Sequence, residues 1–155
     1  MHRWAARRLP SEREGYTLDL DSSALQHEDG HQEGVRVGYT KQGLKPCHRP
    51  LVAALAEGQL IANFWLRRGD AACVNHAAGF VRSTLAGLPA HIRIALVRAD
   101  GGFCSREFLD ALRELRQRYI VAQPLRAQVQ RLCRHDDAHW RDTGIAGVQV
   151  QEVAG

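Results

Sequence analysis

The chain has 155 residues, enough for one domain with a sizeable core or for a piece of a larger domain. Hydrophobic residues make up 45% and charged residues 25%, a composition that excludes disordered and fibrous classes. The net charge of +4 comes mainly from arginine, whose planar guanidinium matches phosphate oxygens, so it favours a polyanionic partner. No apolar run approaches the roughly 18 residues of a membrane-spanning helix, so no membrane association is expected.

Residues 1–15 are polar and basic, and we interpret them as a leader or as the end of a missing N-terminal region. No long apolar segment follows them to form a signal-peptide core, so a cytoplasmic location is expected. The four cysteines are spread along the chain without a Cys-x-x-Cys pair, which argues against structural zinc and against a dithiol redox motif.

The organised part of the chain begins at Tyr16. Residues 16–21 alternate apolar and polar side chains, as a strand does, and the turn-forming Ser22-Ser23 follows, so Asp21 falls at the end of the predicted strand. Three more strands and a loop are predicted next, together forming a meander. They are a strand at 34–39, a loop rich in Gly, Lys and Pro at 40–50, and an antiparallel hairpin of 51–56 with 60–66.

Helical spacing of apolar residues first appears at 74–85. Residues 92–97 are apolar and β-branched enough to form a central strand, and this strand leads to a second aspartate, Asp100. Ser105 is a suitable N-cap for a helix over 106–118. Three shorter elements complete the prediction: a strand at 119–122, a helix at 124–132 and a strand at 148–153.

This order of elements resembles the α/β ribonuclease H-like fold, a mixed sheet flanked by helices. In that fold the first strand and the strand after the first helix lie side by side, which implies that Asp21 and Asp100 come close together. Two divalent metal ions that activate a water or a 3′-hydroxyl need hard oxygen ligands, and carboxylates suit them better than histidine or cysteine. Such a site normally has at least three carboxylates, and the sequence offers two in suitable positions.

Five motifs stand in order along the chain: Leu18–Ser23, His31–Gly34 leading to Val37–Tyr39, Arg49–Leu51, Asn63–Asp70 and Val97–Ser105. As a set they resemble the DDE group 1 transposases of bacterial insertion sequences. The resemblance implies that Asp21 and Asp100 are the first and second catalytic acids and bind Mg²⁺ or Mn²⁺. The third acid, a glutamate, follows later in the family, so the fold is expected to be incomplete at the C-terminus.

The sequence departs from the family pattern at a few positions. The family usually has threonine where Ser23 stands, serine where Gly101 stands, and proline and asparagine where Arg68 and Asp70 stand. None of these departures removes a matched carboxylate. Gly101 loosens the backbone directly after Asp100 and is consistent with a decaying copy of the gene.

Several residues also have ordinary structural interpretations. Without the resemblance, Asp21 and Asp100 would more often be turn residues than metal ligands. Three arginines near predicted strand ends are candidate DNA-backbone contacts, although solvated surface charge is an equal alternative. They are Arg67, Arg68 and Arg98. Asp19 falls on the same strand face as Asp21, where it is either a supporting partner of the site or a solvated side chain.

The resemblance implies a partial transposase catalytic domain over residues 16–155. Its full-length parent would cut and join DNA as a homo-oligomer, with insertion-sequence ends and target DNA as partners. Whether this chain is itself an enzyme is left open, and it is expected to be inactive alone. Two alternatives remain: a non-catalytic DNA-binding or dimerising remnant that interferes with full-length transposase, and a stand-alone metal-dependent nuclease with an unrecognised third acid.

Overall fold

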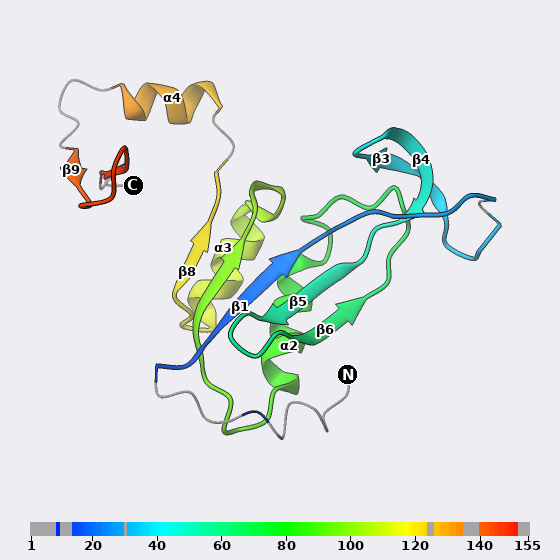
Figure 1. The fold of residues 1–155 in the computed structure, drawn as a ribbon, viewed down its shortest axis with the longest axis horizontal. Helices are drawn as coiled ribbons and strands as arrows, with labels where there is room; N and C mark the ends of the chain where they lie inside the picture. The colour runs from blue at the N-terminus through cyan, green and yellow to red at the C-terminus, as the bar shows by residue number, and fades with distance from the viewer. Residues whose placement is uncertain (1–8, 10–13, 30, 124–125, 135–139, 152–155) are drawn as a thin grey trace. The chain divides into compact units, whose positions relative to one another are not determined.

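The computed structural model describes residues 9, 14–29, 31–123, 126–134 and 140–151 (Figure 1). The chain divides into two compact units, Met1–Gln123 and Pro124–Gly155, and each unit is described by itself. Most of the predicted leader at 1–15 lies outside the described residues, as does the end of the last predicted strand at Val153.

A five-stranded sheet forms the centre of the first unit, with the strand order β6-β5-β1-β7-β8 (Figure 1). β1 pairs antiparallel with β5 and parallel with β7, so the sheet is mixed. The first strand and the strand after the first long helix therefore lie side by side, as predicted. The strands are β1 (Tyr16–Asp21), β5 (Leu51–Leu55), β6 (Leu60–Trp65), β7 (Ile94–Ala99) and β8 (Tyr119–Val121).

Two helices, α2 (Ala77–Gly87) and α3 (Arg106–Glu114), lie together on one face of this sheet (Figure 1). The predicted N-cap of α3 is confirmed, because the Ser105 hydroxyl accepts a hydrogen bond of 3.3 Å from the Phe108 N–H. The predicted helix at 106–118 ends early, at Glu114, where Arg116 takes a left-handed φ of 53° that no helix can continue through.

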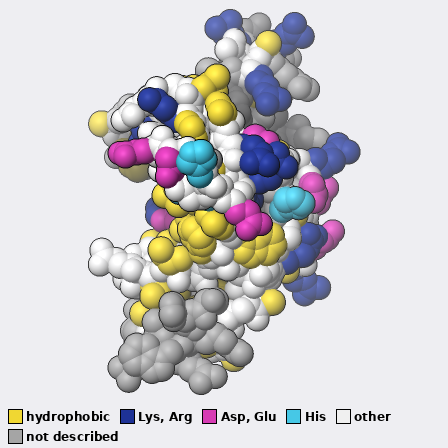
Figure 2. Space-filling model, turned by 90° about the vertical axis from the view of Figure 1, so that its right-hand side faces the viewer, with side chains coloured by type: hydrophobic (Ala, Val, Ile, Leu, Met, Phe, Trp, Pro, Cys, Tyr) yellow, Lys and Arg dark blue, Asp and Glu magenta, His cyan; other side chains and the backbone are white. Residues whose placement is uncertain are grey.

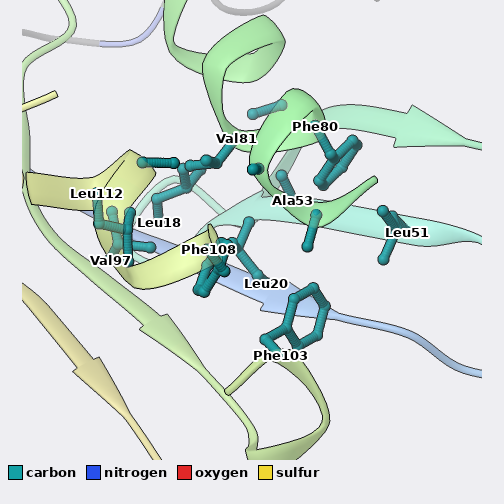
Figure 3. Packing of buried hydrophobic residues seen from close by; sticks show 14 of the residues in the cluster. Leu18, Leu20, Leu51, Ala53, Phe80, Val81, Val97, Phe103, Phe108 and Leu112 are labelled. Carbon is teal, nitrogen blue, oxygen red and sulfur yellow. The ribbon is translucent and has the colours of Figure 1, made fainter. Parts of the chain in front are cut away.

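The core lies between the sheet and the two helices (Figure 3). Alternate residues of β1 and β5 point into it, as the period of two in the sequence predicts. The helices contribute apolar side chains from one stripe each. The fully buried side chains labelled in Figure 3 are Leu18, Leu51, Ala53, Phe80, Val81, Val97, Phe103, Phe108 and Leu112. This packing fixes the positions of the strand ends that carry the aspartates.

The first unit also contains a second, three-stranded sheet of order β2-β4-β3, whose strands come between β1 and β5 in the sequence. Its strands are β2 (Leu25–Gln26), β3 (Arg36–Thr40) and β4 (Gly43–His48). The predicted loop at 40–50 was therefore wrong, because Pro46 lacks only an N–H and its carbonyl still accepts a hydrogen bond of 2.9 Å from the His27 N–H. The single meander was also wrong, since β3 pairs with β4 instead of joining the central sheet.

The second unit contains a short helix and a two-stranded sheet: α4 (Ala127–Cys133), β9 (Arg141–Asp142) and β10 (Gln149–Val150). The helix predicted at 124–132 is present from Ala127 and runs one residue further, to Cys133, while residues 124 and 125 lie outside the described residues. The predicted last strand is present only as the two residues of β10, and its partner β9 was not predicted. Among the described residues, no helix is both long enough and apolar enough to cross a membrane.

Candidate metal centre

Asp21 and Asp100 lie at the same edge of the central sheet. The residues just before them, Leu20 and Ala99, are opposite each other in the parallel register of β1 and β7. Asp21 ends β1, and Asp100 begins the turn that leads to the 3₁₀ helix η1 (Gly101–Phe103). Both aspartates are exposed, and both line one open hollow of about 570 Å³. The structure thus brings together two carboxylates that are far apart in the sequence.

Local hydrogen bonds orient both carboxylates. Oδ1 of Asp21 accepts a hydrogen bond of 2.7 Å from the Ser22 N–H, and Oδ2 accepts one of 3.0 Å from the Ser23 hydroxyl. Oδ1 of Asp100 accepts one of 3.0 Å from the Gly102 N–H. Each carboxylate oxygen has two lone pairs, so both groups keep the capacity to bind a cation.

Arg67 forms hydrogen bonds with several loops near this edge of the central sheet. Its guanidinium donates hydrogen bonds of 3.1, 2.9 and 2.8 Å to the carbonyls of Arg49, Ala72 and Asn75, and one of 3.3 Å to the Ser22 hydroxyl. Burial is the main cause that lowers the pKa of Arg67, and the nearby charge of Arg49 lowers it further. These contacts engage the guanidinium with the protein itself.

Arg68 and Arg98 are each paired with a carboxylate. Arg98 on β7 donates two hydrogen bonds to Asp19 on β1, of 2.6 and 2.7 Å, and this partner raises the pKa of Arg98. Arg68 donates one hydrogen bond of 2.7 Å to Asp70. Asp19 does lie on the same face of β1 as Asp21, as predicted, but its carboxylate forms an ion pair with Arg98.

A family comparison identifies the chain. The model of the transposase DDE domain matches residues 12–152. The chain belongs to the transposase DDE domain family. The predicted transposase-type catalytic domain is thereby confirmed at this level. No curated protein matches the sequence significantly.

Solved structures give a fold-level comparison for this DDE domain. The piggyBac transposase, in a synaptic complex with hairpin DNA, has a TM-score of 0.53 and 12% identity, covering 84% of this chain and 29% of its own. The simian T-cell lymphotropic virus intasome has a TM-score of 0.47 and 15% identity, covering 81% and 41%. The chain therefore spans well under half of either. The first likeness agrees with the strand order and confirms the predicted ribonuclease H-like α/β class.

The carboxylate oxygens of Asp21 and Asp100 are hard ligands, which fit Mg²⁺ or Mn²⁺. The part of the chain that the structure describes contains no group of three or more His, Cys, Asp or Glu side chains placed to hold a metal ion. Two glutamates of α3 lie away from this hollow: Glu107 lines a different hollow, and Glu114 is paired with Arg82 at 2.5 Å. Among the described residues, Asp21 and Asp100 are therefore the two carboxylates that line the hollow.

Sequence reasoning missed another wall of the hollow. It is formed by the end of the β3–β4 hairpin together with the link between β4 and β5, and its residues are Tyr39, Thr40, Lys41, Gln42 and Arg49. The motif Val37–Tyr39 was noted only as part of the family resemblance. Its position beside the aspartates depends on how the small sheet packs against the rest of the first unit, and hydrophobic periodicity does not reveal that packing.

Proposed function

We propose that the chain is the front part of the catalytic core of a DDE group 1 transposase of bacterial insertion sequences, with Asp21 and Asp100 as its first two metal-binding acids. The observation that carries this proposal is the placement of both aspartates at one sheet edge and in one hollow. The family membership supports the same assignment.

When bound, Mg²⁺ or Mn²⁺ would activate an attacking water or 3′-hydroxyl and stabilise the leaving oxygen of a DNA phosphodiester. Asp21 and Asp100 would hold the metal through their carboxylate oxygens. The Ser22 N–H, the Ser23 hydroxyl and the Gly102 N–H fix the orientation of these carboxylates, so that they do not have to reorient on binding.

Metal affinity at a two-carboxylate site is low, because each absent carboxylate removes both a ligand and a charge that offsets the dication. We propose that phosphoryl transfer belongs to the full-length parent, acting as a homo-oligomer with a third acid, and that the chain alone is inactive. Its expected partners are the insertion-sequence ends and the target DNA.

The three candidate DNA-binding arginines have different proposed roles. Arg68 and Arg98 have largely exposed side chains. We propose that they contact the DNA backbone when phosphate groups replace Asp70 and Asp19 as their partners. Arg67 donates four hydrogen bonds within the protein, which supports a positioning role for it: it holds the loop of Ser22 against the loop that precedes α2.

DNA binding in the presence and absence of a divalent metal tests this function. With fluorescently labelled duplex DNA, Ca²⁺ in place of EDTA should tighten binding by about tenfold, because the metal joins the aspartates to a phosphate. The Asp21→Asn/Asp100→Asn double variant should lose this gain, while Asp110→Asn, a carboxylate on α3 paired with Arg113, should keep it.

Equal DNA affinity with and without metal would contradict the proposal and favour the non-catalytic remnant. Cleavage of DNA by the chain alone with Mn²⁺, abolished in Asp100→Ala, would instead favour the stand-alone nuclease.

A further inference from the structure

The β3–β4 hairpin reaches the same hollow as the two aspartates. Its end contributes Tyr39 and Thr40 of β3 and the turn residues Lys41 and Gln42, and Arg49, between β4 and β5, completes this wall. Figure 2 looks at the molecule from the side where β3 and β4 lie in Figure 1, and it shows Lys and Arg side chains interspersed with Asp and Glu on this face. The aspartates therefore form one part of the hollow, and cationic and aromatic side chains form another.

The hairpin is held rigidly where it leaves the central sheet. A Cβ atom on Gly38 of β3 would lie 2.1 Å from the carbonyl oxygen of Gly69, and one on Gly69 would lie 2.2 Å from the carbonyl oxygen of Cys47. Backbones can approach this closely only where both residues are glycine. The thiol of Cys47 is buried and also contacts the Gly69 carbonyl, at 3.9 Å.

Two further contacts fix the hairpin beside the hollow. His48, at the end of β4, forms an isolated β-bridge with Arg68. The guanidinium of Arg49 donates a hydrogen bond to the Tyr39 carbonyl, which leaves most of its five N–H donors available. The end of the hairpin that carries Tyr39 and Lys41 is thus held in place before any ligand binds.

Tyr39 is the aromatic side chain on this wall, and it is 72% exposed. An exposed tyrosine ring offers a flat surface for stacking with little conformational entropy to lose. Among the residues that the structure describes, no ion pair joins Lys41 or Arg49 to a carboxylate. Both cations are therefore available to an anion in the hollow.

The charge pattern of the hollow selects its occupant. The carboxylates attract a cation, and Lys41 and Arg49 attract an anion. A DNA strand with a metal ion bound to its phosphates provides a partner for both groups. A protein partner would have no need of the metal-binding edge. On the basis of the proposed function, we infer that the β3–β4 hairpin positions a DNA strand across the aspartates: Tyr39 stacks on an unpaired base, and Lys41 and Arg49 bind the adjoining phosphates.

This inference is tested with the full chain and two labelled duplexes that differ only by one unpaired 2-aminopurine, whose fluorescence falls when an aromatic ring stacks on it. Four proteins are compared by anisotropy and by 2-aminopurine fluorescence: wild type, Tyr39→Ala, Tyr39→Phe and Leu44→Ala. Leu44 is the matched control, since it lies directly opposite Tyr39 in the hairpin and is equally exposed at 72%, but it does not line the hollow.

Tyr39→Ala should weaken binding of the duplex with the unpaired base by about tenfold and should abolish the fluorescence quenching, because base–aromatic stacking contributes on the order of 1–3 kcal/mol. Tyr39→Phe and Leu44→Ala should behave like wild type, and the fully paired duplex should not distinguish the variants.

Unchanged binding and quenching in Tyr39→Ala, on DNA that the wild type binds, would overturn the inference and leave the proposed function standing. An equal loss in Leu44→Ala would also overturn it, because the effect would then be general to the hairpin. Absence of DNA binding by the wild type would overturn the proposed function and the inference together.

Discussion

Gly38 on β3 and Gly69 on the loop before α2 lie in direct backbone contact: a methyl group on Gly38 would be only 2.1 Å from the Gly69 carbonyl oxygen. Neither backbone has room to move away without disturbing the small sheet. This contact explains how a hairpin that is separate from the central sheet keeps a fixed position beside the two aspartates.

Gly38→Ala should therefore lower the free energy of unfolding by about 1–3 kcal/mol, the usual cost of inserting a methyl group where no space exists. Chemical denaturation measures this change. Gly79→Ala is the control, since its added Cβ would meet Trp65 at an ordinary 3.8 Å, and alanine suits the helix better than glycine. Equal stability of Gly38→Ala and wild type would show that the hairpin is not held by this contact.

Removing the Arg67 side chain should destabilise the first unit. Arg67→Ala leaves the carbonyls of Arg49, Ala72 and Asn75 without their donor, at a cost of about 1–3 kcal/mol in unfolding free energy. Arg67→Lys should recover little of it, because an ammonium group cannot span three carbonyls as the guanidinium fork does. Thermal and denaturant unfolding of both variants provide the measurement.

Arg68→Ala is the neighbouring control for Arg67, because its exposed ion pair with Asp70 contributes at most about 1 kcal/mol. If Arg67→Ala were no less stable than Arg68→Ala, then the Arg67 hydrogen bonds would not hold the loops together, and a direct contact with DNA would become the better explanation for this arginine.

Arg98 should contribute less to DNA affinity than Arg68 does. Arg98 is engaged by Asp19 through two hydrogen bonds, whereas Arg68 makes one with Asp70. Asp19 raises the pKa of Arg98, whose guanidinium is already protonated at neutral pH, so the side chain stays charged and available to Asp19 under mildly alkaline conditions. Titration of labelled duplex DNA into Arg98→Ala and Arg68→Ala at low salt compares them. A larger loss in Arg98→Ala would contradict this ranking.

Much of the central sheet follows from sequence pattern. The period of two in β1 and the apolar run before Asp100 predicted both strand ends, because side chains on a half-buried sheet must alternate and a central strand must be apolar. That the two strands are neighbours came from the family resemblance, since periodicity says nothing about which strands pair. The parallel register of Leu20 with Ala99 now supports this expectation.

The small sheet could not be predicted from the pattern of apolar and polar residues. Gly43 and Pro46 are typical of loops, and only the pairing of β4 with two other strands satisfies its backbone hydrogen bonds. Contact between Gly38 and Gly69 depends on tertiary packing, so the place of Tyr39 in the hollow has no local signal in the sequence. The second unit was predicted only in part for a related reason, since strands of two residues are too short to show a period.

The most direct test of the proposed metal centre is a calorimetric titration of the chain with Mn²⁺, alongside the variants Asp21→Asn, Asp100→Asn and Asp110→Asn. Weak binding is predicted for the wild type and for Asp110→Asn, and its loss is predicted in both Asp21→Asn and Asp100→Asn, because the two carboxylates share one ion. Binding that survives in either of these two variants, or no binding by the wild type, would contradict a metal site built on Asp21 and Asp100.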